Sequence, residues 1–203
     1  MAGRGTDTEL DDLLSAAREV LAERGYDGLR VEDVLAYAGL STRAFYRHFS
    51  GKAALFLALF EQESVRADQR LRARVERARG PVEAVREWIA GVLALSYDAR
   101  LAKRSRLFAG DQGALARRFP DDVHKLTRRQ LEPLEDAIAD GKKAGLFPVA
   151  HPVDDARAIH HLCSGLMGDR LNGTSTLSYE QAVALATRFA LHALKADTIK
   201  DQP

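Results

Sequence analysis

Residues 31–52 read VEDVLAYAGLSTRAFYRHFSGK and decide the fold class of this chain. The first half has apolar side chains at the i, i+3, i+4 and i+7 spacing of one helix face, namely Val31, Val34, Leu35 and Ala38. Gly39 is expected to end this helix, because glycine adopts positive φ at little cost. Ser41 is expected to cap a second helix over 42–49 by accepting a hydrogen bond from the backbone near Ala44. The stretch therefore predicts two short helices joined by a tight turn.

The second helix of the pair carries side chains suited to contact DNA. Ala44, Phe45 and Phe49 share its apolar face, and the remaining side chains turn outward: Thr42, Arg43, Tyr46, Arg47 and His48. Arginine bonds guanine edges or phosphate, threonine contacts a thymine methyl or a phosphate, and tyrosine and histidine hydrogen-bond phosphate. Lys52 follows the next turn, where the first N–H groups of a further helix also attract phosphate. The pair therefore indicates a helix-turn-helix whose second helix enters a DNA groove.

Two of these residues also have ordinary structural interpretations. Tyr46 suits a half-buried packing position, because its ring can rest against the domain as well as against the groove. Arg43 is the best candidate for reading bases, although an arginine on an exposed helix is by default a solvated charge. A short amphipathic helix pair occurs in many all-α proteins, so it is the joint aromatic and basic pattern that favours DNA binding.

The pattern continues on both sides of the pair. It runs from Glu23-Arg24-Gly25-Tyr26-Asp27-Gly28 through Val31, Ala38-Gly39-Leu40-Ser41 and Phe45-Tyr46-Arg47-His48-Phe49 to Lys52, Leu55 and Phe56. With this pattern, residues 9–60 closely resemble the N-terminal domain of the TetR family of bacterial transcriptional regulators. The remainder is similar to that family only in length and helical character. The resemblance implies that the five outward residues of the second helix face DNA and that Lys52 holds the DNA backbone.

Some positions depart from the family pattern. Leu29 and Arg30 stand where members usually carry threonine or serine, so the customary hydroxyl cap of the first helix is missing, and we expect Arg30 to contact phosphate instead. Many relatives have alanine at Leu35. At Ala53 they commonly have an acidic residue that would complete a capping box with Ser50. These departures concern the details of DNA contact rather than the module itself.

The overall charge does not by itself point to nucleic acid. The 203 residues include 30 basic and 29 acidic side chains, which gives a net charge of +1. Residues 1–52 hold seven lysine or arginine and nine aspartate or glutamate side chains. DNA affinity must therefore come from local placement, and we expect a binder that discriminates between sites and loses affinity steeply with salt.

Several other classes of protein lack support in the sequence. Cys163 is the single cysteine, which excludes an internal disulfide and, beside Leu162 in an apolar helix, indicates a small buried thiol. No apolar run approaches the roughly 20 residues of a membrane span, and residues 1–8 lack the apolar core of a signal peptide. We therefore expect a cytoplasmic protein that makes no membrane contact.

No motif supports catalysis or metal binding. The chain has no P-loop, no G-x-S-x-G elbow, no paired cysteine ligands and no HExxH. His124, His160 and His161 do not form a metal-ligand spacing with acidic residues. We therefore expect that the protein is not an enzyme and that it binds neither a metal nor a cofactor.

Helical periodicity continues along the chain, and no strand pattern competes with it. A first helix is expected over 8–24, ended by Gly25, and packs behind the helix pair. Ser50 is expected to open a long linking helix that continues to position 79 and spans about 45 Å at ~1.5 Å per residue. Further helices are expected over 82–97, 101–109, 121–144, 154–171 and 178–194.

The predicted fold is therefore all-α. A three-helix helix-turn-helix DNA-binding domain occupies 1–52, and a larger helical effector-binding and dimerisation domain occupies 53–203. Pro133 is expected to kink or interrupt the helix over 121–144. A capping box formed by Ser178 and Gln181 is expected to start the last helix.

The second domain has residues suited to a ligand cavity and to a dimer interface. Large apolar groups that are predicted to line a small-molecule cavity, but that equally suit a dry core, are Trp88, Leu95, Phe108, Phe119, Leu126, Leu162 and Met167. The last two helices carry wide apolar faces, and the TetR resemblance implies that they pair with their copies in a four-helix interface. The candidates there are Ile159, Leu166, Val183, Ala186, Phe189 and Ala190, with an ordinary intramolecular core as the alternative.

Together these features predict a ligand-responsive regulator. The resemblance implies a homodimeric repressor whose two reading helices fit half-sites of a palindromic double-stranded DNA operator about one turn, or roughly 34 Å, apart. A small apolar or amphipathic effector would release it from DNA, provided that the effector binds the two states with different affinity. The alternative is a helical small-molecule carrier with a degenerate DNA-binding domain.

Overall fold

The chain folds into helices joined by turns and short loops. The computed structural model describes residues 6–108 and 112–195, and over these ranges it contains helices and no strand. The helices are α1 (Thr6–Gly28), α2 (Val31–Ala38), α3 (Thr42–His48), α4 (Lys52–Val75), α5 (Pro81–Tyr97), α6 (Ala99–Arg106), α7 (Gln112–Arg118), α8 (Pro120–Lys143), α9 (Pro152–Leu171) and α10 (Tyr179–Ala193). The predicted all-α fold is confirmed.

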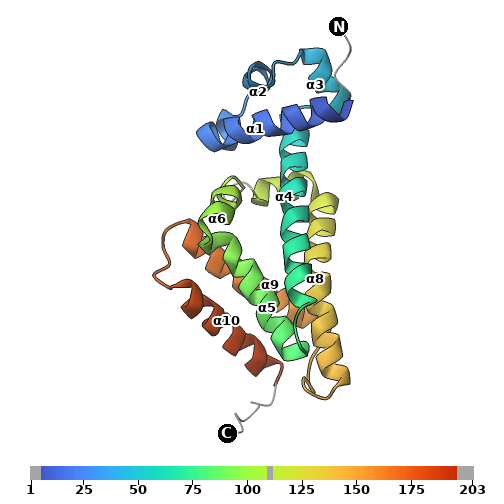
Figure 1. Cartoon of the computed structure of the whole chain (residues 1–203), viewed down its shortest axis with the longest axis vertical. Coiled ribbons are helices and arrows are strands. Elements are labelled where there is room, and N and C mark those ends of the chain that lie inside the picture. The colour runs from blue at the N-terminus through green and yellow to red at the C-terminus, as the bar shows by residue number, and fades with distance from the viewer. Residues whose placement is uncertain (1–5, 109–111, 196–203) are drawn as a thin grey trace.

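The helices form a small unit and a larger one. Helices α1, α2 and α3 lie together at one end of the molecule (Figure 1). Helix α4 leaves this unit and runs toward the opposite end, where it packs against α5 and α8 (Figure 1). Helix α9 packs against α5 and α8, and α10 packs against α5 and α9. Helix α4 is therefore the element that joins the two units.

The helix pair forms as the sequence predicts. Gly39 follows α2 in the left-handed conformation, with φ 63°. Ser41 caps α3, and its Oγ accepts a hydrogen bond from the Ala44 backbone N–H at 3.2 Å. The predicted capping box at α10 is also present, with Ser178 and Gln181 each bonding the other's backbone. These local signals are reliable because each one satisfies backbone groups that a helix end leaves unpaired.

The linking helix is shorter than the sequence suggested. It begins at Lys52 after Gly51 rather than at Ser50, and it ends at Val75 rather than at position 79. Beyond Val75 the Arg77 and Ala78 amides bond carbonyls three residues back, which tightens the chain out of α-helical geometry. At 24 residues α4 spans about 36 Å instead of about 45 Å.

Other boundaries differ in smaller ways. Helix α1 continues to Gly28, although Gly25 has the non-helical φ of 66° and interrupts it where the sequence predicted its end. Helix α8 runs through Pro133 without interruption, and this proline is buried in the face that packs on the larger unit. Helix α7 was not predicted, because its seven residues, QGALARR, include only one large apolar side chain and so show no helical period.

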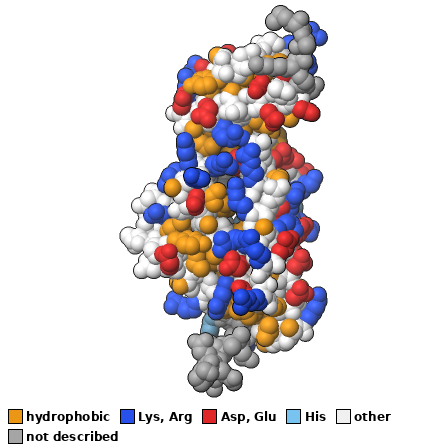
Figure 2. Space-filling model, in the orientation of Figure 1, with side chains coloured by type: hydrophobic (Ala, Val, Ile, Leu, Met, Phe, Trp, Pro, Cys, Tyr) orange, Lys and Arg blue, Asp and Glu red, His pale blue; other side chains and the backbone are white. Residues whose placement is uncertain are grey.

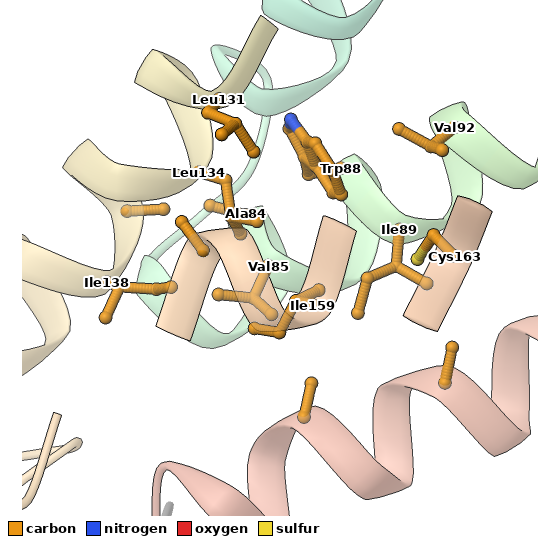
Figure 3. Packing of buried hydrophobic residues seen from close by; sticks show 14 of the residues in the cluster. Ala84, Val85, Trp88, Ile89, Val92, Leu131, Leu134, Ile138, Ile159 and Cys163 are labelled. Atoms are coloured by element: carbon orange, nitrogen blue, oxygen red, sulfur yellow. The ribbon is translucent and has the colours of Figure 1, made fainter. Parts of the chain in front are cut away.

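Two hydrophobic cores share α4. The first core joins α1, α2 and α3 to Leu55, Phe56 and Leu59 of α4, and it also includes Phe108 and Leu115. The second core lies among α4, α5, α8, α9 and α10. Figure 3 shows its centre, where Trp88 and its neighbours on α5 point toward side chains of α8 and α9. The proposed division after residue 52 thus falls in the first turn of α4, and residues beyond it complete the first core.

A buried carboxylate connects α4 to α8. Asp68 has only 3% of its side chain exposed, and it accepts hydrogen bonds at 2.9 Å from Arg72 of its own helix and from Arg129 of α8. Arg72 also donates to Glu132 at 2.8 Å. A carboxylate this buried is tolerated because both arginines compensate its charge.

We expect Asp68→Asn to lower the free energy of unfolding by about 1–3 kcal/mol, since it removes a buried charge that two arginines require. Urea denaturation followed by circular dichroism measures this change. Glu132→Gln is the matched control, because Glu132 is about half exposed and its pair with Arg72 is worth less than about 1 kcal/mol. Equal stability of the two variants would contradict the role assigned to Asp68.

Candidate nucleic-acid interface and effector cavity

Helix α3 is held on the small unit by its apolar face. Phe45 is fully buried, and Ala44 and Phe49 are nearly so. The Phe45 ring packs against the rings of Phe49 at 5.6 Å and Tyr46 at 5.3 Å, measured between centroids. Burial of one face fixes which side chains of this short helix reach solvent, so the outward set follows from packing.

Three residues of the outward set are free to meet a ligand. Thr42, Arg43 and Tyr46 are exposed, and 60% of Tyr46 is accessible to solvent. Within residues 6–108 and 112–195, the side chains of Thr42 and Arg43 make no hydrogen bond or ion pair. A basic, a hydroxyl and an aromatic side chain therefore stand unpaired on one surface, as contact with base edges and phosphates requires.

The last two residues of α3 are tied to α1. Arg47 donates two hydrogen bonds from Nη2 to the Glu9 carboxylate, at 2.7 and 2.9 Å. His48 has only 9% of its side chain exposed, and its Nε2 lies 3.6 Å from Glu9 Oε2. The sequence predicted both side chains to turn outward, whereas packing on α1 turns His48 inward and leaves Arg47 exposed but paired.

The remaining predicted DNA contacts flank α3. Ser41 is exposed and caps the helix. Lys52 lies with its Nζ 4.3 Å from the centre of the Tyr26 ring and donates to the Asp27 carbonyl at 3.3 Å. Arg30 is exposed at the start of α2 and makes no side-chain cap there. The absence of that cap agrees with the departure from the family pattern at this position.

A cavity of about 260 Å³ lies in the larger unit among α4, α5, α6, α8 and α9. Its apolar lining includes Phe60, Val92, Leu95, Phe108, Met167 and Leu171. Its polar lining includes Glu63, Arg70, Arg104, Thr127, Gln130 and His160. The cavity is amphipathic, with side chains able to hold both an apolar body and a polar group.

Only part of the predicted effector set lines this cavity. Leu95, Phe108 and Met167 do so. The others lie elsewhere: Trp88 is fully buried in the second core, Phe119 packs against the first core, Leu126 is partly buried outside the lining, and Leu162 lines a smaller apolar pocket beside α10. Trp88 still borders the site, because its Nε1–H donates to the Gln130 carbonyl at 3.1 Å.

The charged residues of the cavity were not predicted from the sequence. Glu63, 12% exposed, lies within ion-pair distance of Arg66 at 2.7 Å, Arg104 at 3.5 Å and Arg18 at 3.8 Å. These arginines come from α4, α6 and α1, so one carboxylate contacts both units of the molecule. In the sequence these residues look like the solvated face of amphipathic helices, and only the fold brings them together.

An apolar surface remains open on α9 and α10. Phe189 is 66% exposed and Val153 is 52% exposed, while Leu166 and Val183 are partly buried. The other candidates for the dimer interface, Ile159, Ala186 and Ala190, are buried within the chain. Phe189 and Val153 are therefore the large apolar side chains of α9 and α10 that the single chain leaves most exposed.

Over residues 6–108 and 112–195, no three His, Cys, Asp or Glu side chains gather as a metal site would require. In the same part of the chain, no helix is both long enough and apolar enough to span a bilayer.

Comparisons with known proteins agree with this geometry. Residues 13–59 match the family model described as bacterial regulatory proteins, tetR family. Two curated relatives share this part: the HTH-type transcriptional regulator CymR of Pseudomonas putida, 36% identical over 77 residues, and the HTH-type transcriptional repressor AcnR of Corynebacterium diphtheriae, 37% identical over 79 residues. The matches cover 38% and 39% of this chain and the same shares of the two relatives.

Solved structures match over nearly the whole chain. A putative TetR-family regulator from Rhodococcus sp. has a TM-score of 0.74 at 23% identity and covers 92% of this chain and 98% of its own. AibR, solved in complex with isovaleryl coenzyme A and operator DNA, has a TM-score of 0.63 at 18% identity and covers 89% of this chain and 97% of its own. At these identities the likeness establishes the fold, a helix-turn-helix unit followed by a larger helical unit.

The cavity wall contains a histidine whose protonation opposes folding. Burial, together with the neighbouring His161, lowers the pKa of His160 below its usual 6.5. The unfolded chain therefore binds this proton at a higher pH than the folded chain. The resulting contribution to stability is present above the unfolded pKa and is lost as the pH falls below it.

When the pH is lowered from about 7.5 to about 5.5, we expect the free energy of unfolding to fall less in His160→Gln than in the parent protein. Urea denaturation at the two pH values measures the difference. His124→Gln, at an exposed position of α8, is the matched control and should keep the parent's pH dependence. An unchanged pH dependence in His160→Gln would count against a buried neutral imidazole at the cavity.

Proposed function

We propose that this chain, whose N-terminal domain is a TetR-family helix-turn-helix domain, is a transcriptional regulator that represses by binding a palindromic operator as a homodimer and leaves DNA when a small effector binds. The observation that carries this proposal is the outer face of α3. There Thr42, Arg43 and Tyr46 are exposed and unpaired on a helix that packing fixes in place. A rigid helix with such a face fits the major groove.

Arg43 is proposed as the main base-reading residue and Tyr46 as a phosphate contact. Arg47 is paired with Glu9, and this pair sets the direction in which the Arg47 side chain would meet DNA. Lys52 and Arg30 flank the helix and are proposed to hold phosphates. His48, being largely buried, acts in this scheme by packing beside Glu9 rather than by reaching a base.

The homodimer is proposed to form through the outer faces of α9 and α10. Phe189 and Val153 are large apolar side chains that water surrounds in the single chain. Removal of this surface from water by a second copy would contribute about 25 cal/mol per Å² of apolar area. A two-fold axis through this face places two α3 helices for a palindromic site.

The effector is proposed to occupy the cavity among α4, α5, α6, α8 and α9. AibR, which has this fold, was solved with a coenzyme A thioester and operator DNA together. In this chain Phe60, Glu63 and Arg70 of α4 line the cavity, while Leu55 and Phe56 of the same helix lie in the core under α3. A ligand that shifts α4 therefore changes the position of the DNA-reading unit.

A carrier with a degenerate DNA-binding domain is the alternative function. It would also use the cavity, but it would have no need for unpaired Thr42 and Arg43 on α3. Selective retention of DNA separates the two possibilities, because a carrier binds its ligand and shows no preference among DNA fragments.

Arg43→Ala and Tyr46→Ala are each expected to weaken operator binding by about 1–3 kcal/mol, since each removes a direct contact. Fragments retained from the source genome at two salt concentrations supply the operator, and fluorescence anisotropy measures the affinity. Arg86→Ala, an exposed arginine of α5 outside this surface, is the control. Full affinity in both α3 variants would refute the assignment of this helix.

Phe189→Glu is expected to convert the dimer to a monomer, because it replaces the exposed apolar side chain of α10 with a charge. Sedimentation velocity reports the change in mass. Val149→Glu replaces another exposed apolar residue outside α9 and α10, and it should leave the dimer intact. A dimeric Phe189→Glu protein would move the interface away from α10.

A further inference from the structure

The lining of the cavity in the larger unit includes both apolar and charged side chains. Its walls are formed by apolar side chains such as Val92, Leu95 and Met167. Two arginines belong to the same lining, Arg70 on α4 and Arg104 on α6, and both are exposed to solvent. Figure 2 shows Lys and Arg side chains gathered over the middle of the molecule, where α4 and α6 lie, beside a hydrophobic patch.

The charges around this part of the cavity are not balanced. Glu63 is the only carboxylate of the cavity lining in the described chain, and it is shared among Arg104, Arg66 and Arg18. Arg104 holds it at 3.5 Å, the long end of an ion pair, whereas Arg66 holds it at 2.7 Å. Within the described ranges Arg70 has no ion pair or hydrogen bond. The site therefore has more positive charge than its own carboxylate neutralises.

The geometry points to a small anionic amphiphile as the ligand of this cavity: an apolar body between α5 and α9 with a carboxylate or phosphate group bound by Arg70 and Arg104. This inference rests on the proposed function, because it specifies the effector of the same cavity. A guanidinium binds the oxygens of such a group through paired N–H donors. A neutral ligand lacks the charged acceptor that this pairing requires. The ligand's anionic group replaces Glu63 as the partner of Arg104.

The size of the cavity limits the apolar body. At about 260 Å³ it lies just under the roughly 300–1,000 Å³ of pockets that hold drug-sized ligands. A medium-length alkyl chain is therefore a suitable probe. Three probes share the same eight-carbon chain and differ only at the end: octanoate, octyl phosphate and 1-octanol.

Trp88 provides the readout. It is the single tryptophan of the chain, and its ring centre lies 6.3 Å from that of His160 in the cavity wall. Titration of Trp88 fluorescence in the DNA-free full-length protein should give saturable binding of octanoate, octyl phosphate or both, with 1-octanol at least about tenfold weaker. Binding by either anion alone supports the inference and identifies which headgroup the arginines prefer.

Variants test the two arginines directly. Arg70→Gln and Arg104→Gln should each weaken binding of the anions by about tenfold and leave 1-octanol unchanged. Arg70→Gln disturbs no ion pair of the described chain, so loss of folding does not explain its effect. Arg86→Gln, on the exposed face of α5, is the matched control. Glu63→Gln should tighten anion binding, because it removes the competing carboxylate.

Three results would overturn the inference: 1-octanol binding as tightly as octanoate, no saturable binding of either anion, or unchanged anion affinity in Arg70→Gln and Arg104→Gln. These outcomes are independent of the proposed function. Suppose that the protein selects genomic DNA, that Arg43→Ala abolishes this selection, and that neither anion binds. The proposed regulatory function is then supported, and the proposed anionic effector is refuted. If the anions bind and no DNA is selected, the chain is a carrier.

Discussion

Helix α4 imposes the constraint on which the rest of the structure depends, because one rigid helix belongs to two hydrophobic cores. Its first half supplies Leu55, Phe56 and Leu59 to the core under α3, and its second half supplies Leu71 to the core around Trp88. A helix transmits displacement along its axis because its backbone hydrogen bonds leave little freedom to bend. The cavity begins directly beyond the core under α3, because Phe60 of α4 lines the cavity and the preceding Leu59 lies in that core. Under the proposed function, a displacement of α4 at the cavity is therefore also felt under α3.

Electrostatic contacts reinforce this coupling. Glu63 lies at the middle of α4, lines the cavity and contacts arginines of α1 and α6, so its charge is shared between the two units. Asp68, one turn further, fixes α4 to α8 through Arg129. The Glu63 carboxylate thus lies at the cavity, where a ligand can compete for its arginine partners. The Asp68 carboxylate is buried and has a structural role. Under the proposed function, that difference lets α4 respond to a ligand at Glu63 while it stays anchored at Asp68.

The sequence predicted those features of the fold that depend on residues close together along the chain. Val31 to Phe49 follow from helical spacing, a glycine turn and the Ser41 cap, and the structure has all three. It did not predict the inward turn of His48, because the partner Glu9 is far away in the sequence. The polar part of the cavity was missed for the same reason: Glu63 and Arg104 lie 41 positions apart, and they resemble solvated charges until the fold brings them within 3.5 Å.

Under the proposed function, the pair between Glu9 and Arg47 explains how an acidic domain can present a selective DNA surface. An arginine held by a carboxylate at 2.7 Å adds little to the long-range attraction for DNA, because the pair is nearly neutral at a distance. The same pair holds the Arg47 guanidinium against α1, so less side-chain entropy is lost when a phosphate or base approaches. Non-specific attraction is thereby reduced while the directed contacts remain. Under the proposed function, discrimination then rests on unpaired Arg43 and Thr42, whose bonds form only where the base pairs offer matching groups.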